Sequence, residues 1–109
     1  MRKLVYIAGP MRGIPDWNYP KFNRTAIFLR LHGYCVINPV EIGDYFGSPE
    51  YLEANPKLLG LAMDIELCCI SRCDCIYLLD GWETSDGARK ELETALRHGL
   101  KVLDERHAV

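Results

Sequence analysis

The 109-residue sequence lacks the features that mark several large classes of protein. The apolar run that follows Arg2-Lys3 is only a few residues long, too short for a secretory signal peptide or a membrane span. Basic residues do not outnumber acidic ones, and the net charge of -2 provides no basic surface for a nucleic-acid polymer or an anionic membrane. We therefore expect a cytoplasmic protein with neither kind of partner.

The cysteines lack an informative spacing. There are five, an odd number, and Cys68 and Cys69 are adjacent, which disfavours a disulfide framework. The segment Cys73-Asp74-Cys75 has the spacing of neither a zinc site nor a thioredoxin-type motif. We expect small buried thiols in a reducing compartment, and no metal or cofactor.

The glycine patterns of the dinucleotide-binding fingerprint and of the P-loop are also absent. What the sequence does contain is an alternation of short apolar runs with helical stretches. Strand-like runs cover residues 4–8, 34–38, 75–79 and 100–103, and helical spacing covers residues 20–33, 55–71 and 85–98.

This order predicts a single α/β domain over residues 1–109. Because strand, helix, strand units cross over with a right hand, we expect a doubly wound sheet of flavodoxin or Rossmann type, with four or five mostly parallel strands. Numbered along the chain, the strands are expected in the order 2-1-3-4. The tail over residues 104–109 is expected to fray.

Residues 39–55 form the longest stretch without a helical or strand pattern. Asp44, Tyr45, Phe46 and Tyr51 make it acidic and aromatic. Three interpretations stay open: it covers a site and stacks on a base, it forms a lid over the edge of the core, or it makes an oligomer contact.

The predicted helix that begins after Ser85 carries a glutamate on its apolar side. Ser85 is a good N-cap, and Ala88, Leu92 and Ala95 recur with helical spacing. Glu91 falls on the same side, three residues after Ala88 and four before Ala95. Either its side chain extends to water at the margin of the apolar face, or it is a nucleophile or general base.

The predicted helix that begins at Asn55-Pro56 places a second carboxylate in a similar way. Its apolar face is expected to consist of Leu58, Leu61, Ile65, Cys68 and Cys69. Asp64 shares that side of the helix, whereas Glu66 does not.

Polar and glycine residues follow the ends of the predicted strands, where open parallel sheets bind ligands. The loop Gly9-Pro10-Met11-Arg12-Gly13 follows the first strand, and its glycines let backbone amides approach a ligand. Arg12 suits a phosphate or carboxylate. Tyr6, Asp80 and Ser85 are expected at the same edge. With two carboxylates nearby, the set suits cleavage at a sugar C1 through an oxocarbenium-like transition state.

Three ordered motifs carry a resemblance to a known family. They are Tyr6 to Gly13, then Asp64-Ile65 followed by Cys73 to Tyr77, then Ser85, Gly87 and Glu91-Leu92. Together they resemble the nucleoside 2-deoxyribosyltransferase superfamily over nearly the whole chain, most closely a short branch common in phage and bacterial genomes. The first motif is particularly similar to that of the deoxynucleoside 5'-monophosphate N-glycosidases.

The resemblance implies an enzyme that cleaves the N-glycosidic bond of a deoxyribonucleoside or its 5'-monophosphate, by hydrolysis or base transfer, and that forms a homodimer or larger homo-oligomer. It implies that Glu91 is the nucleophile. We expect the helix dipole and a hydrogen bond from the Tyr6 hydroxyl to keep Glu91 ionised, and Asp64 to help the base leave. The alternative is an inactive module that binds or sequesters a nucleotide. The expected substrate- and phosphate-binding residues are Gly9, Pro10, Met11, Arg12, Gly13, Asp80, Ser85 and Gly87.

Overall fold

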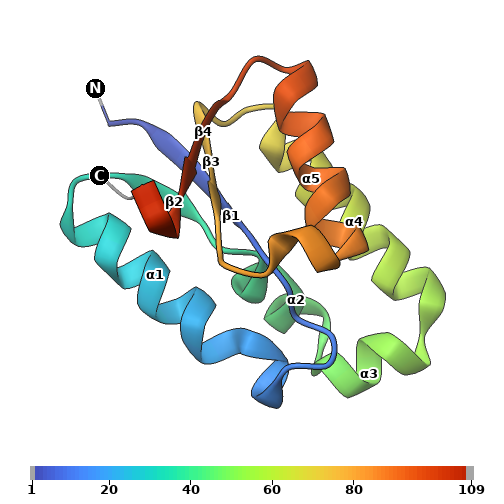
Figure 1. Cartoon of the computed structure of the whole chain (residues 1–109). Helices are drawn as coiled ribbons and strands as arrows, with labels where there is room; N and C mark the ends of the chain where they lie inside the picture. The colour runs from blue at the N-terminus through green and yellow to red at the C-terminus, as the bar shows by residue number, and fades with distance from the viewer. Residues whose placement is uncertain (1, 108–109) are drawn as a thin grey trace.

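The centre of the molecule is a four-stranded sheet, seen in a computed structural model that describes residues 2–107 (Figure 1). Its strands are β1 (Leu4–Ala8), β2 (Cys35–Ile37), β3 (Cys75–Leu78) and β4 (Lys101–Asp104). They lie in the order β2-β1-β3-β4, and every neighbouring pair is parallel. The predicted α/β class, parallel pairing and strand order are confirmed, so the carboxyl ends of the strands share one edge.

The central strand β1 separates two cores. Side chains alternate along a strand, so Val5 and Ile7 face one side of the sheet while Tyr6 and Ala8 face the other. Because β1 is paired along both of its edges and covered on both faces, all four residues are fully buried. A tyrosine in such a position needs a hydrogen-bond partner for its hydroxyl.

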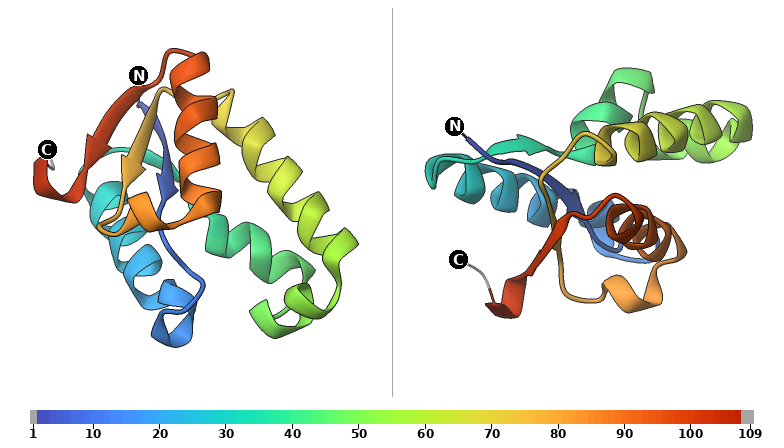
Figure 2. Two further views of the ribbon diagram at one scale, coloured as in Figure 1. Left: turned by 45° about the vertical axis from the view of Figure 1, so that its right-hand side comes forward. Right: turned by 90° about the horizontal axis from the view of Figure 1, so that it is seen from above.

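Helices cover both faces of the sheet (Figure 2). Helix α1 (Tyr19–Leu31) packs against Val5 and Ile7 through Phe22, Ala26 and Leu29. Helices α4 (Pro56–Ile70) and α5 (Asp86–Arg97) lie on the opposite face with Tyr6. Tyr6 is therefore on the face that also carries the two helices with candidate carboxylates.

The expectation of an irregular segment over residues 39–55 is wrong, because it contains α2 (Pro39–Phe46) and α3 (Pro49–Ala54). Each helix begins with a side-chain cap followed by proline. The Asn38 side chain accepts a hydrogen bond from the Val40 N–H, and the Ser48 hydroxyl accepts one from the Tyr51 N–H. These are favourable N-caps, and proline suits the first turn.

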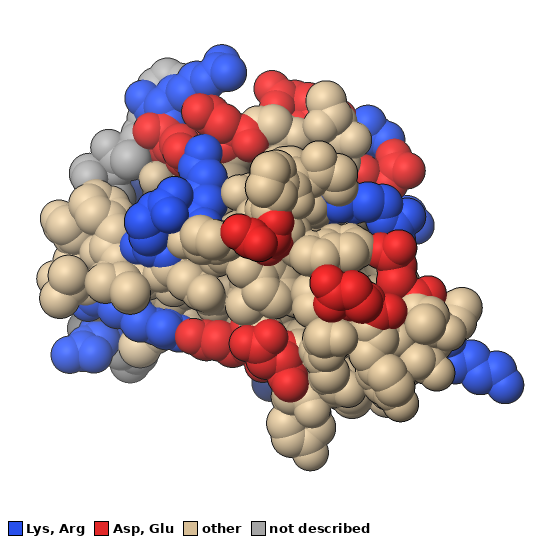
Figure 3. Space-filling model, turned by 90° about the horizontal axis from the view of Figure 1, so that it is seen from below, with Lys and Arg blue, Asp and Glu red and all other residues tan. Residues whose placement is uncertain are grey.

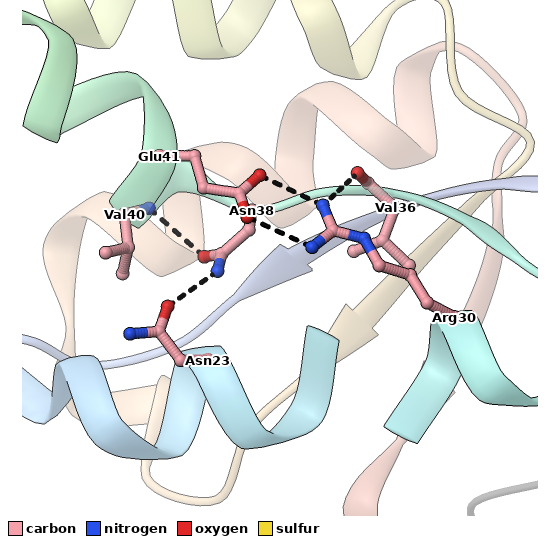
Figure 4. A network of polar contacts seen from close by, with 6 residues as sticks. All are labelled: Asn23, Arg30, Val36, Asn38, Val40 and Glu41. Carbon is pink, nitrogen blue, oxygen red and sulfur yellow. Dashed lines mark hydrogen bonds and ion pairs between the residues drawn. The ribbon is translucent and has the colours of Figure 1, made fainter. Parts of the chain in front are cut away.

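A polar network fixes α2 against the rest of the fold (Figure 4). The guanidinium of Arg30, near the end of α1, donates to both carboxylate oxygens of Glu41 on α2, at 3.0 and 2.9 Å, and also to the Val36 carbonyl. Buried Asn38 donates to the Asn23 side chain at 2.9 Å. These contacts orient α2 beside the carboxyl end of β2.

Three single-turn helices complete the connections: η1 (Pro15–Asn18), η2 (Trp82–Thr84) and η3 (Glu105–His107). The tail does not fray at Glu105, whose carboxylate accepts from the Asp80 N–H at 2.7 Å and pairs with Lys21 at 2.8 Å. The last residues of the predicted fraying tail, 108–109, lie outside the described part.

Within residues 2–107, no helix is both long enough and apolar enough to cross a membrane.

Candidate functional site

A cavity of about 500 Å³ lies at the edge where the strands end. This volume is within the usual range of small-molecule sites. Figure 3 looks onto this end of the molecule, where acidic side chains gather and basic ones lie mainly toward the margins. The lining includes Gly9, Pro10, Met11 and Arg12 in the β1–α1 loop, Glu53 on α3, Glu66 on α4, and Ser85, Gly87, Lys90 and Glu91 around the start of α5.

Behind this cavity, the buried hydroxyl of Tyr6 joins two glutamates from different helices. Its oxygen lies 2.5 Å from Oε2 of Glu91 on α5 and 3.3 Å from Oε1 of Glu66 on α4. The expected hydrogen bond between Tyr6 and Glu91 is therefore present. Both carboxyl groups are partly buried and also line the cavity, so they can reach a bound ligand.

The two carboxyl groups hold protons unusually tightly. Burial raises the pKa of Glu66 from 4.5 to about 7, although its hydrogen bonds to Glu91 and Tyr6 act in the opposite direction. Burial also raises the pKa of Glu91 well above its ordinary value, with a further contribution from the charge of Glu66. The Tyr6 hydrogen bond lowers the pKa of Glu91 but does not outweigh burial. The expectation that Tyr6 and the helix dipole prevail over desolvation is therefore wrong.

Tyr6, Glu66 and Glu91 lie so close together that their protonation states depend on one another. Tyr6 has one hydroxyl proton, and burial raises its pKa well above the ordinary value, so it stays protonated. Two ionised carboxylates beside one hydroxyl would repel each other strongly in a poorly solvated site. The Glu66–Glu91 pair therefore retains a proton near neutral pH and titrates as one unit.

The side of the cavity near α5 is suited to an anion. The Ser85 hydroxyl caps α5 by accepting from the Ala88 N–H at 3.2 Å. The first amides of α5 lie beside Gly87, and helix N-termini favour negative charge. Arg12 and Lys90 line the same cavity, are exposed, and form no ion pair within residues 2–107.

The loop after β1 begins too close to the residue that follows β3 for any residue but glycine. A Cβ atom at Gly9 would lie 2.7 Å from the Cβ of Leu79. Further along the loop, Asp16, Trp17 and Asn18 all have left-handed backbone angles, with φ between 55° and 60°. The Asn18 side chain holds this turn by donating to the Pro10 carbonyl at 2.9 Å, and Trp17 reaches the cavity wall.

The predicted positions of three site residues are wrong. Asp64 is exposed and does not line the cavity, because α4 is rotated so that Glu66 faces inward. Asp80 also lies outside the lining, since its backbone bonds to Glu105 and its carboxylate pairs with Arg106 at 3.3 Å. Gly13 is exposed in the turn beyond the loop wall.

Glu66 is the important residue that sequence analysis missed. The inward face of α4 consists of Leu59, Ala62, Met63, Glu66, Leu67 and Ile70. This set also has helical spacing, so the signal was present in the sequence. It competed with a second apolar set on the other side of the helix.

The structure also bears on the cysteine prediction. All five cysteines are free thiols, but Cys35 and Cys68 are exposed rather than buried. Within residues 2–107, no group of three or more His, Cys, Asp or Glu side chains is arranged to hold a metal ion.

The fold and these side chains define a parallel α/β domain with a tyrosine-bridged glutamate pair at the carboxyl edge of its sheet. A family model described as a domain of unknown function (DUF4406) matches residues 3–104, and the chain belongs to that family. A comparison with curated proteins finds no match.

Proposed function

We propose that this protein cleaves the N-glycosidic bond of a deoxyribonucleoside or its 5'-monophosphate. The observation that carries this proposal is the contact of Glu91 and Glu66 with one tyrosine hydroxyl beside a nucleotide-sized cavity. Glycosidic cleavage commonly uses two carboxyl groups, one of which stays protonated while the other is ionised. The motif resemblance to nucleoside 2-deoxyribosyltransferases supports the same chemistry.

The separation of the carboxyl groups favours a covalent route. Both touch the same oxygen, at 2.5 and 3.3 Å. Their nearest oxygens are therefore closer together than the roughly 6.5–9.5 Å typical of enzymes that activate a water between the two groups. A nucleophilic carboxylate that forms a glycosyl ester fits the shorter separation.

In the reactive form, Glu91 is ionised and Glu66 carries the shared proton. The short hydrogen bond from Tyr6 lowers the pKa of Glu91 and so supports this form, although burial keeps that pKa above its ordinary value. Glu91 attacks C1 of the sugar, the bond from C1 to the base nitrogen breaks, and the base takes the Glu66 proton. Water then attacks C1, gives its proton to Glu66 and releases Glu91; in base transfer, a second base attacks instead.

A 5'-phosphate would bind on the α5 side of the cavity. Arg12 and Lys90 supply positive charge, and the first amides of α5 supply N–H donors. The neighbouring Asp86 carboxylate also lines the cavity, but it is paired with Arg89. These groups favour a nucleotide over an uncharged nucleoside.

We further infer a homodimer that uses the outer side of α4. Leu58, Leu61, Ile65 and Cys68 recur there with helical spacing, and 48% of the Leu61 surface is exposed. An apolar row of this kind on the outer side of a helix is typical of a protein contact. A cytoplasmic location is part of the same proposal, since it suits five free thiols.

The test is base release from a panel of deoxynucleosides and their 5'-monophosphates, followed by chromatography. A slow substrate should also leave a sugar adduct on Glu91, visible as a mass increment on the intact protein. Binding of a nucleotide without release from any substrate would replace the enzyme with the sequestering module. If the protein neither bound a nucleotide nor released a base, both functions would be rejected.

A further inference from the structure

The wall of the cavity formed by α2 and α3 contributes one acidic side chain, Glu53, and no basic one. Residues 39–55 contain four acidic residues and neither lysine nor arginine. The opposite side carries Arg12, Lys90 and the start of α5. The views in Figure 2 place α2 and α3 on one side of the β1–α1 loop and η2 with the start of α5 on the other.

If the proposed function holds, this difference in charge between the two sides of the cavity orients a bound nucleotide. The phosphate is attracted to the α5 side and repelled from α3. With the phosphate at the first turn of α5, the sugar C1 must lie at Glu91, about one turn further along α5, and at Glu66 on α4, which line the same cavity. The base therefore extends toward α2 and α3.

On that side, Glu53 is the acidic residue that lines the cavity. Glu41, Asp44 and Glu50 belong to the same segment but are absent from the lining. Glu53 is exposed and makes no hydrogen bond or ion pair within the described residues. Its apolar neighbours in the lining include Pro49, Leu52 and Leu59. The flat face of a base can pack against this apolar surface while the polar edge of the base meets the unpaired carboxylate of Glu53.

We propose that Glu53 recognises the base and selects guanine. Carboxylate oxygens only accept hydrogen bonds, so a carboxylate pairs best with two adjacent donors. Guanine presents a ring N–H next to an exocyclic amine. Adenine and cytosine place an acceptor beside their amine, and thymine places its single N–H between two carbonyls, so each would set an oxygen or nitrogen lone pair against the carboxylate.

The experiment compares dGMP with dIMP, which lacks only the exocyclic amine, and with dAMP, dCMP and dTMP. Binding is measured by calorimetry and base release by chromatography, for the wild type, Glu53→Gln and Glu50→Gln. Glu50 is a matched control because it lies on α3, is exposed and does not line the cavity. The wild type should prefer dGMP over dIMP by roughly tenfold to a hundredfold, the range of a hydrogen bond to a charged group.

Glu53→Gln should lose most of this preference and Glu50→Gln should keep it. Base release with no preference for dGMP, or a preference that survives in Glu53→Gln, would overturn the role of Glu53 and leave the proposed function standing. Selective dGMP binding that is lost in Glu53→Gln, without base release, would support Glu53 and overturn the catalytic proposal. Failure to bind any of these nucleotides would overturn both.

Discussion

Helices α4 and α5 lie on the same face of the sheet and each bring one glutamate to Tyr6, but their apolar residues are distributed differently. In α5 the buried residues Ala88 and Ala95 lie on one side, and Glu93 and Arg97 on the other side are exposed. A helix with a single apolar side can pack in only one orientation.

Helix α4 has apolar residues on both sides. Ala62 is 2% exposed and faces the core, while Leu61 beside it is 48% exposed. The chain covers only one of these sides, so the other is left to solvent or to another molecule. The comparison teaches that α4 carries Glu66 to Tyr6 from its covered side and leaves apolar residues uncovered on its opposite side.

The largest expected effect tests the glutamate of α5. Glu91→Gln keeps the size of the side chain but removes the charge that attacks C1, so base release should fall by orders of magnitude. Nucleotide binding and the midpoint of thermal unfolding should change little, because glutamine can still accept the Tyr6 hydrogen bond. Wild-type base release by this variant would remove Glu91 from the mechanism.

The next largest expected effect tests which carboxylate of α4 takes part in base release. Glu66→Gln should lower base release by roughly 10²–10⁴-fold, the usual contribution of a general acid or base. Asp64→Asn, a matched control on an exposed side of the same helix, should leave the rate unchanged.

A substrate whose base leaves without being protonated shows whether Glu66 acts as the acid or only supports the structure of the site. A 7-methylguanine deoxynucleotide carries its positive charge already, so Glu66→Gln should cleave it at nearly the wild-type rate. If Asp64→Asn were the slower variant, the assignment of the acid to Glu66 would have to be abandoned.

The raised pKa of Glu66 also predicts how stability depends on pH. Between pH 4.5 and about 7 the folded protein holds a proton on Glu66 that the unfolded chain releases. The free energy of unfolding should therefore fall as pH rises through this window, by up to about 1.4 kcal/mol per pH unit. Urea unfolding of the wild type and Glu66→Gln at several pH values measures it. The difference between the two proteins should shrink toward acid pH; a constant difference would count against the raised pKa.

The anion side of the cavity gives a smaller effect. Arg12→Ala should weaken binding of nucleoside monophosphates by about 1.5–3 kcal/mol, the range for a charge-assisted hydrogen bond, and should barely affect nucleosides. Arg24→Ala, an exposed arginine of α1 outside the cavity, is the control. Equal losses for nucleotides and nucleosides would show that Arg12 acts on structure rather than on the phosphate.

The fold could be predicted because its signals are local. Each strand is a short apolar run, and Ser85 and Asn55-Pro56 mark helix starts that the structure reproduces. The same kind of signal is present at Asn38-Pro39 and Ser48-Pro49, within or beside the stretch 39–55 that is predicted to be irregular. Cap and proline together are compatible with a helix start as well as with a turn.

The candidate site could be predicted only where a helix has one apolar side. Glu91 could be placed from Ala88 and Ala95, because most of the other residues of α5 are charged. Glu66 could not, because α4 offers two rotations that both bury apolar residues. The two rotations are distinguished only by contacts between residues far apart in the sequence, such as the one from Tyr6 to Glu66, 60 positions later. The position of Asp80 depends in the same way on Glu105, 25 residues later.

The smallest effect on the folded chain tests the outer side of α4. Leu61→Lys places a charge in the proposed dimer contact but leaves the inner side untouched, so stability of the isolated chain should change by less than about 0.5 kcal/mol, as for other surface substitutions. Light scattering at micromolar concentration should show a dimer for the wild type and a monomer for this variant, because an unpaired charge is disfavoured in a desolvated contact. Leu96→Lys is the matched control, since Leu96 is also an exposed leucine, with 59% of its surface accessible, but it lies on α5, outside the proposed contact. It should remain a dimer. A monomeric wild type, or dissociation by Leu96→Lys but not by Leu61→Lys, would show that α4 does not form the contact.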